Sequence, residues 1–389
     1  MSQQDAVDPF GPATLGPVTL RNRIVKAATF EGRTRDHVVS DELVEFHCRM
    51  AAGGVGMTTV AYLAVSPDGC GTPNELILGP DAAPGLARLA EAVHAEGAAI
   101  SGQIGHAGAV AAGTGLPGLS PSPVFSPLAM KRTKAVTADQ IRRIIGDFAA
   151  GAAILADAGF DAVELHLGHG YLPSEFLSPR LNRRSDEWGG SLENRARLSR
   201  EIAAAVREAV GGRVAVLAKL NMADGVRGGL WLDESVEVGR MLERDGTLDA
   251  IELTAGSSLQ NPMYLFRGEA PVAEMARAMP KVIRPAFRLF GRAFLREYPY
   301  AEAYLLPYAR QFRAALDMPL ILLGGINRIE TVHGALAEGF EFVALGRALL
   351  REPELVDRWQ KGAMHESLCV HCNKCMATIY RGTRCVLVE

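Results

Sequence analysis

Eight short apolar runs, each as long as a buried strand, recur along the chain and alternate with helical patterns. Runs that are apolar on both faces are typical of parallel strands covered on both sides. Eight of them separated by helices predict a (β/α)8 TIM barrel of the α/β class. A doubly wound open sheet is the alternative, but the count of eight and the absence of an early GxGxxG pattern favour the barrel. The expected strands are Ile24–Thr29, Gly56–Tyr62, Ala98–Gln103, Ala162–His166, Val214–Leu220, Ala250–Thr254, Leu320–Leu323 and Phe342–Leu345.

The segments between these runs carry helical patterns. In Asp139–Ala158, apolar residues recur at the spacing of one helix face, and Thr137 precedes them as a suitable N-cap. A second helix is expected over Glu193–Val210.

Three segments exceed a minimal barrel. Segments 67–80 and 114–134 are rich in Gly and Pro, which predicts loops over the catalytic face. Segment 257–304, between the sixth and seventh strands, carries many aromatic and Arg residues. It is either extra helical packing or a lid over the substrate pocket. We therefore expect a barrel domain over residues 1–360, with this insertion, and a cysteine-rich tail over 361–389 packed on it.

Composition narrows the class of function. The 389 residues are 22% charged and 48% hydrophobic, which suits a globular protein with a large core. A net charge of −3 provides no strong field for nucleic acid or an anionic membrane. The first ten residues lack the basic and apolar parts of an export signal. These features predict a cytoplasmic protein with a small-molecule substrate, no nucleic acid and no membrane, and they leave a homo-oligomer open.

Glycines follow the seventh and eighth predicted strands. Gly324 and Gly325 come after the seventh strand, and Gly346 and Arg347 after the eighth. Glycine lets backbone N–H groups approach an anion closely, and these two loops form the usual phosphate site of this barrel. Plain turn glycines are the alternative, but both pairs together with the arginine predict a phosphate site.

Two imidazoles and a phenol follow the fourth predicted strand. His166 ends the strand, and His169 and Tyr171 come within the next five residues. Active groups of a barrel lie at the C-terminal ends of its strands, so these three are the candidate catalytic residues. An HxxH pair can also bind a metal ion, but no third ligand is evident in the sequence.

Four of the six cysteines crowd the end of the chain with the spacing C-x2-C-x2-C-x9-C. Without an export signal, such a group is more typical of a metal or redox site than of a disulfide framework. Four thiolates can hold a [4Fe–4S] cluster or a zinc ion, and the spacing does not separate the two. Reduced or disulfide-linked thiols without metal are the alternative. The four are Cys369, Cys372, Cys375 and Cys385.

The stretch 160–197, FDAVELHLGHGYLPSEFLSPRLNRRSDEWGGSLENRAR, resembles the motif of the Old Yellow Enzyme family of flavin-dependent ene reductases. LRNRIVKAATFEG (20–32) and GQIGHAG (102–108) look like the first-strand and third-strand motifs of that family. The resemblance covers about residues 8–360. It implies an FMN cofactor, NAD(P)H as a transient reductant, and an enone or related activated alkene as the substrate.

The resemblance also implies roles for single residues. His166 and His169 would donate hydrogen bonds to the substrate carbonyl, and Tyr171 would protonate the α-carbon. Gln103 would bind the pyrimidine edge of the flavin. Lys219 stands where many members carry an arginine near flavin N1. Further flavin contacts are implied at Ala27, Ala28, Thr29, Tyr62 and His166, with Gly324, Gly325, Gly346 and Arg347 at the phosphate.

The tail CVHCNKCMATIYRGTRCVLV looks like the iron–sulfur segment of the 2,4-dienoyl-CoA reductase and trimethylamine dehydrogenase branch, where the spacing is slightly longer. One alternative is therefore an iron–sulfur flavoprotein, a dienoyl reductase or amine demethylase that exchanges electrons with a partner carrier. A non-catalytic flavin-binding protein is another. A purely structural role of the tail, closing one end of the barrel, is as compatible with the sequence as electron transfer.

Overall fold

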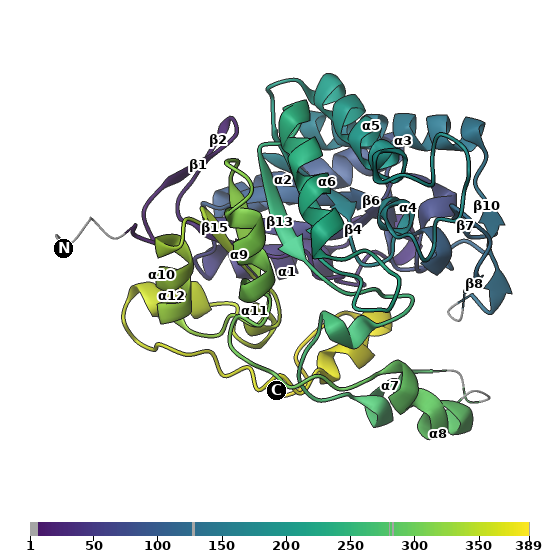
Figure 1. Ribbon diagram of the computed structural model, residues 1–389. Helices are drawn as coiled ribbons and strands as arrows, with labels where there is room; N and C mark the ends of the chain where they lie inside the picture. The colour runs from purple at the N-terminus through teal and green to yellow at the C-terminus, as the bar shows by residue number, and fades with distance from the viewer. Residues whose placement is uncertain (1–6, 127–128, 280, 282–283, 389) are drawn as a thin grey trace.

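Eight parallel strands close into a barrel in the computed structural model, which describes residues 7–126, 129–279, 281 and 284–388 (Figure 1). The strands neighbour one another in the order β3, β15, β14, β13, β12, β11, β6, β4, and pairing of β3 with β4 closes the ring. All eight coincide with predicted runs, so the TIM barrel is confirmed. The strands are β3 (Ile24–Lys26), β4 (Met57–Ala64), β6 (Ala99–Gly105), β11 (Ala162–Leu167), β12 (Ala215–Asn221), β13 (Ala250–Thr254), β14 (Leu320–Leu323) and β15 (Phe342–Leu345).

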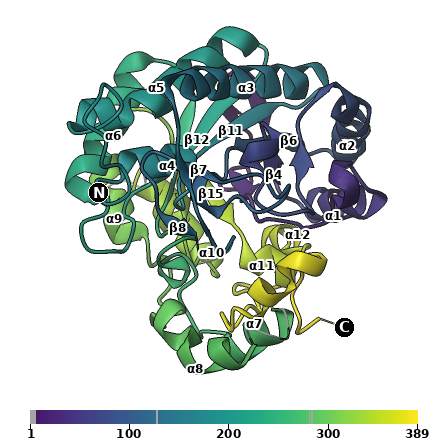
Figure 2. The same ribbon diagram turned by 90° about the vertical axis from the view of Figure 1, so that its right-hand side faces the viewer.

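Helices surround the strands, as Figure 2 shows. The predicted helix over 139–158 is α3, and it begins with a capping box in which Thr137 and Gln140 bond reciprocally. Buried apolar side chains fill the space between the helices and the strands. The helices are α1 (Asp41–Ala52), α2 (Ala83–Ala95), α3 (Ala138–Asp157), α4 (Leu172–Leu177), α5 (Leu192–Val210), α6 (Leu232–Asp245), α7 (Val272–Ala278), α8 (Arg284–Phe294), α9 (Leu306–Arg313), α10 (Ile329–Ala337), α11 (Arg347–Arg351) and α12 (Leu355–Gln360).

A hairpin of β1 (Ala13–Leu15) and β2 (Val18–Leu20) closes the N-terminal end of the barrel, and the sequence patterns did not predict it. Its Leu15 and Leu20 pack with side chains near the start of the barrel strands, among them Phe342. Three-residue strands are too short to show an alternating pattern, and only the Gly16-Pro17 turn marks them in the sequence. With this end filled, a pocket has to open at the opposite end, where the strands terminate.

The segments beyond the minimal barrel hold small elements of their own. The two Gly/Pro-rich segments contain β5 (Leu76–Ile77) and the short pairs β7 (Leu119–Ser120) with β10 (Lys134–Ala135) and β8 (Phe125–Ser126) with β9 (Lys131–Arg132). The insertion forms α7 and α8, which lie outside the helical ring beside the tail (Figure 2). There α7 packs on the 3-10 segment Lys374–Arg381 of the tail. No helix in the described ranges is both long and apolar enough to span a bilayer.

Candidate functional site

The structure brings the three candidate catalytic residues together at the C-terminal end of β11. The His166 ring centroid lies 5.0 Å from that of His169 and 4.4 Å from that of Tyr171. Tyr62, near the end of β4, joins them with its ring centroid 5.2 Å from Tyr171. All four aromatic side chains therefore border one site.

His166 is a neutral hydrogen-bond donor in this site. Burial, helped by His169 and Lys219, holds its pKa well below the usual range. The Gly168 N–H donates to His166 Nδ1 at 3.4 Å, so the neutral ring carries its proton on Nε2. That N–H is free to donate to a substrate oxygen.

His169 is held by its neighbours in a left-handed backbone conformation with φ 59°. Its backbone N–H donates to Asn221 Oδ1 at 3.1 Å, and its Nε2 lies 2.7 Å from the Thr254 hydroxyl. Burial, with Lys219 nearby, lowers the pKa of the His169 ring to about 3. When Thr254 donates to Nε2, the proton of the neutral ring sits on Nδ1 and remains available to a ligand.

The Tyr171 phenol stays protonated in its surroundings. Burial raises its pKa well above the usual value, and the nearby Glu75 and Tyr380 raise it further. Two neutral imidazoles beside a protonated phenol can stabilise a developing oxyanion and supply a proton to carbon.

The Lys219 ammonium lies inside the barrel between two buried carboxylates. Its Nζ is 2.8 Å from Glu164 Oε1 and 2.7 Å from Glu252 Oε1. Burial alone would lower the Lys219 pKa, but Glu164 and Glu252 together raise it, so the amine is charged. Gln103 joins the group by donating from Nε2 to Glu164 Oε1 at 2.7 Å. Because an amide nitrogen carries two hydrogens, Gln103 keeps one donor and its acceptor for a ligand.

The sequence analysis did not identify Glu164 and Glu252, although the strand patterns that contain them indicate buried carboxylates. Each is the one charged residue at the centre of an otherwise apolar strand pattern, VEL in β11 and IEL in β13. Strand pairing places Gln103 beside Glu164 and Lys219 beside Glu252. A buried carboxylate requires a partner, so these patterns pointed to the cation on the strand between them.

The ends of the first and eighth strands meet at the predicted phosphate loops. A side chain on Gly346 would lie 3.5 Å from the Thr29 methyl group, and the Thr29 hydroxyl is buried without a partner. Gly324 and Gly325 have φ of 117° and 71°, which favours glycine. The N–H groups of Gly325 and Gly346 find no acceptor among the described residues. Free backbone donors beside an unpartnered hydroxyl fit a phosphate-bearing cofactor such as FMN.

Arg347 connects these loops to the insertion and to the tail. Its Nη1 donates to the Arg267 carbonyl at 3.1 Å and also to Asn373 Oδ1 of the tail. Its Nη2 donates to the Tyr304 hydroxyl at 3.2 Å. Both terminal nitrogens are thus used within the protein, and Arg347 supplies positive charge to the phosphate loops while it fixes their surroundings.

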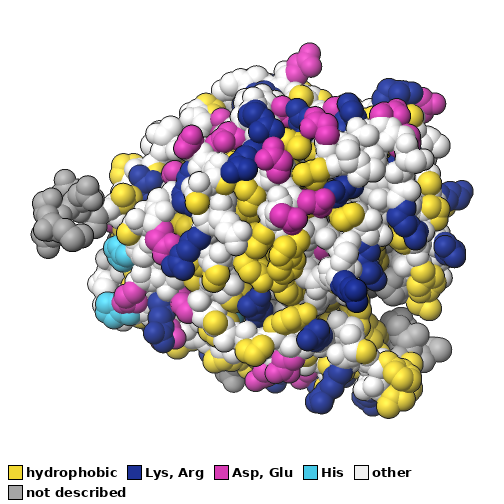
Figure 3. Space-filling model, in the orientation of Figure 1, with side chains coloured by type: hydrophobic (Ala, Val, Ile, Leu, Met, Phe, Trp, Pro, Cys, Tyr) yellow, Lys and Arg dark blue, Asp and Glu magenta, His cyan; other side chains and the backbone are white. Residues whose placement is uncertain are grey.

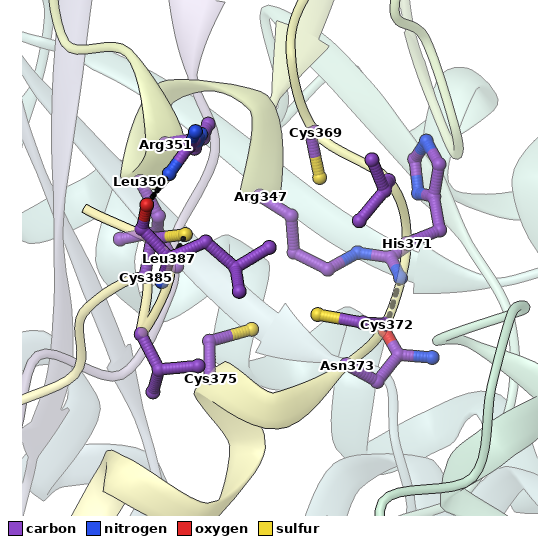
Figure 4. A pocket seen from close by; sticks show the side chains of 12 residues that line it. Arg347, Leu350, Arg351, Cys369, His371, Cys372, Asn373, Cys375, Cys385 and Leu387 are labelled. Atoms are coloured by element: carbon purple, nitrogen blue, oxygen red, sulfur yellow. Dashed lines mark hydrogen bonds between the residues drawn. The ribbon is translucent and has the colours of Figure 1, made fainter.

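The four tail cysteines line a single cavity of about 20 Å³ next to Arg347. Figure 4 shows all four sulfur atoms turned toward the space between them. Burial raises the pKa of Cys369, and it raises that of Cys375 to about 11. In the described ranges, no three His, Cys, Asp or Glu side chains lie close enough to share an ion. The donor chemistry fits a metal, but the cavity holds only about one water, so the thiols would have to rearrange around it.

Glu75 is a further buried acid beside Tyr171 that the sequence analysis did not identify. Burial raises its pKa to about 8 even though the backbone of Gly71 donates to its carboxylate. A folded-state pKa above the ordinary value of 4.5 means that Glu75 favours folding below about pH 4.5 and loses this contribution as the pH rises toward 8.

We therefore expect Glu75→Gln to flatten the pH dependence of stability. From pH 6 to pH 9 the wild type should lose about 3 kcal/mol more unfolding free energy than the variant, since one pH unit corresponds to roughly 1.4 kcal/mol per proton and the difference accumulates from pH 6 to about pH 8. Thermal melts of both proteins at several pH values would measure this. Parallel curves would mean that Glu75 is ionised throughout.

Comparison with known proteins agrees with this geometry. Residues 8–254 match the model of the NADH:flavin oxidoreductase / NADH oxidase family. The chain is 54% identical over 380 residues to the 4,4'-dithiodibutanoate disulfide reductase of Rhodococcus erythropolis, covering 97% of this chain and 94% of that protein. It is 30% identical over 371 residues to the multifunctional alkene reductase/demethylase OYE of Caballeronia cordobensis, covering 94% of this chain and 50% of the relative.

Solved structures share the same fold. Morphinone reductase in complex with tetrahydroNAD superposes with a TM-score of 0.70 at 25% identity, covering 93% of this chain and 92% of the other. A 2-naphthoyl-CoA reductase complex superposes with a TM-score of 0.78 at 24% identity, covering 91% of this chain and 52% of the other. The chain thus spans about half the length of two of these relatives, the Caballeronia protein and the 2-naphthoyl-CoA reductase.

Proposed function

The chain belongs to the NADH:flavin oxidoreductase / NADH oxidase family, and from that premise we propose that it reduces activated C=C bonds of α,β-unsaturated carbonyl compounds. It is an NAD(P)H:flavin oxidoreductase of the Old Yellow Enzyme type that binds FMN. This membership sets aside the non-catalytic alternative. The observation that carries the proposal is the pair of neutral imidazoles beside a protonated phenol. The ring centroids of Tyr171 and His166 are 4.4 Å apart.

In this proposal the chain's own groups divide between cofactor and substrate. When bound, FMN would supply the hydride-transfer chemistry between NAD(P)H and the alkene, and the residues of the chain would hold it in place. Gln103 and Lys219 would contact its ring, together with Tyr62, His166 and the Ala27–Thr29 segment. The loops at Gly324, Gly325 and Gly346 would hold the phosphate, with the positive charge of Arg347 beside them.

The substrate side belongs to His166, His169 and Tyr171. The two imidazole N–H groups donate to the carbonyl oxygen and stabilise the negative charge that grows there as the β-carbon is reduced. Tyr171 keeps its proton at neutral pH and gives it to the α-carbon.

The direct test is a pair of half-reactions on the purified protein. Its absorption spectrum should show bound flavin, and NADH or NADPH should bleach these bands anaerobically. Addition of 2-cyclohexenone should then restore them in a single turnover. A flavin that NAD(P)H reduces but no enone reoxidises would contradict the proposed substrate class and leave the family activity intact.

Tyr171→Phe tests the proton donor. We expect turnover of weakly activated alkenes to fall about 10²-fold, because general acid catalysis typically contributes 10²–10⁴-fold. Reduction of the flavin by NAD(P)H should be unchanged. Steady-state rates with a strongly and a weakly activated enone would measure the effect, with Tyr308→Phe on helix α9 as a control at a tyrosine outside the site. Unchanged rates with both substrates would point to a different proton donor.

Disulfide reduction is the second candidate, because the Rhodococcus relative at 54% identity is a 4,4'-dithiodibutanoate disulfide reductase. The same site suits it chemically: two electrons cleave the S–S bond, and the donors of His166, His169 and Tyr171 stabilise and protonate the thiolate products. Parallel kcat/KM values for 2-cyclohexenone and 4,4'-dithiodibutanoate would decide between the candidates. A ratio above about 10² in either direction would assign the preferred substrate.

The four tail cysteines are proposed as a metal site, either a [4Fe–4S] cluster or zinc. Their shared cavity and the inward direction of their sulfurs support this (Figure 4). Iron, zinc and acid-labile sulfide analysis of anaerobically purified protein would identify the metal, and Cys372→Ser should release it. If all four tail thiols can be titrated and neither iron nor zinc is bound, this proposal is contradicted. Bound iron and sulfide would favour the alternative in which a partner carrier exchanges electrons with the flavin.

A further inference from the structure

Segment 267–297 is basic although the net charge of the whole chain is small. Residues 267–297 hold seven Lys and Arg but three Asp and Glu, in a chain whose net charge is −3. This segment contains α7 and α8. The weak overall field expected from the net charge therefore does not describe this part of the molecule.

The arginines of α8 form a stripe. Arg284, Arg288 and Arg292 follow one another at intervals of four residues, which places them on one side of the helix. Arg288 and Arg292 are exposed, and within the described part of the chain neither has a carboxylate within 4.0 Å. Glu274, the nearby acid on α7, lies 3.8 Å from the Lys374 ammonium and is already partnered.

Large apolar side chains lie beside this stripe on the outer side of α8. Leu289 is 74% exposed and Phe290 67% exposed. The opposite side of the helix packs inward at the buried Gly291, where an added Cβ would lie 3.1 Å from Val272 of α7. Apolar and basic side chains adjoin at the lower right of Figure 3, the region that α8 occupies in Figure 1.

We propose that α8 binds the headgroup layer of an anionic lipid membrane, with Leu289 and Phe290 inserted and Arg288 and Arg292 on lipid phosphates. A strongly amphipathic helix with arginines on its polar side and Phe and Leu on the other is the usual form of such an anchor. A second copy of the chain fits less well, because a symmetric contact through α8 would bring the two unpaired arginine stripes together. The inference does not depend on the redox substrate.

Vesicle sedimentation of the flavin-loaded protein tests this. We expect binding to vesicles containing phosphatidylglycerol, little binding to pure phosphatidylcholine vesicles, and release at high salt. Arg288→Gln with Arg292→Gln, and separately Leu289→Gln with Phe290→Gln, should each lower the partition coefficient at least about tenfold. Lys131→Gln with Lys134→Gln and Phe125→Gln are matched controls, because these side chains are exposed on the β8–β10 segments.

Flavin content and the thermal midpoint confirm that each variant is folded. The proposal fails if wild-type protein does not bind phosphatidylglycerol vesicles, or if the α8 variants bind as well as the controls. It also fails if no vesicle binding occurs and Leu289→Gln with Phe290→Gln converts a dimer into a monomer, because that result places a second copy on α8.

Discussion

Replacing His169 with alanine should slow reoxidation of the reduced flavin by an enone about 10²-fold or more, the usual effect of removing one oxyanion donor. Flavin reduction by NAD(P)H should change by less than about threefold, because no oxyanion develops in that half-reaction. Since the His169 pKa is lowered to about 3, titration of this ring should contribute no change to the wild-type reoxidation rate between pH 5 and pH 8. Stopped-flow absorbance at the flavin band measures both half-reactions.

Two controls define this result. His365→Ala removes an exposed imidazole that contacts Glu330 and none of the site residues named above, and it should leave both half-reactions unchanged. Thr254→Val keeps the His169 ring but removes the hydroxyl that lies 2.7 Å from its Nε2. We therefore expect a smaller decrease in the rate of flavin reoxidation. Equal slowing of both half-reactions in His169→Ala would indicate a displaced flavin and contradict the assigned role.

The barrel could be predicted because its strands are buried on both faces. Runs such as Leu320–Leu323 are apolar throughout, and each ends in a visible change of composition. His166, His169 and Tyr171 could be predicted for the same reason, since they stand where a strand ends. The β1–β2 hairpin could not, because three-residue strands carry no periodicity.

The surroundings of the site depend on contacts between distant segments, and these leave little trace in the sequence. Arg347 contacts Arg267 and Asn373, residues 80 and 26 positions away in the chain. Glu75 lies near Tyr171 only because a Gly/Pro-rich loop folds back over the barrel. Sequence patterns indicate which residues face the centre of the barrel. The contacts among these residues depend on how distant segments fold together.

Lys219 shows how such a contact determines the chemistry. As a lone lysine at a strand end, it suggested a cation held for the flavin. In the structure it also forms ion pairs with Glu164 and Glu252. Burial raises the pKa of Glu252 to about 7, with Glu164 adding to the effect and Lys219 opposing it. The Lys219 ammonium therefore stabilises the barrel, in addition to any contact that it makes with a bound flavin.

Lys219→Met should consequently destabilise the fold by about 3–5 kcal/mol at pH 8, the usual result of leaving a buried charge unpaired. The loss should shrink at pH 5, because carboxyls whose folded-state pKa is raised regain their protons as the pH falls and then need no cation. Urea unfolding at both pH values would measure this.

Adding Glu252→Gln to Lys219→Met should restore much of the stability at pH 8. Flavin affinity should nevertheless remain low if Lys219 also contacts the ring. Full recovery of flavin binding in the double variant would restrict Lys219 to a structural role, and an equal loss of stability at both pH values would contradict the buried-carboxylate explanation.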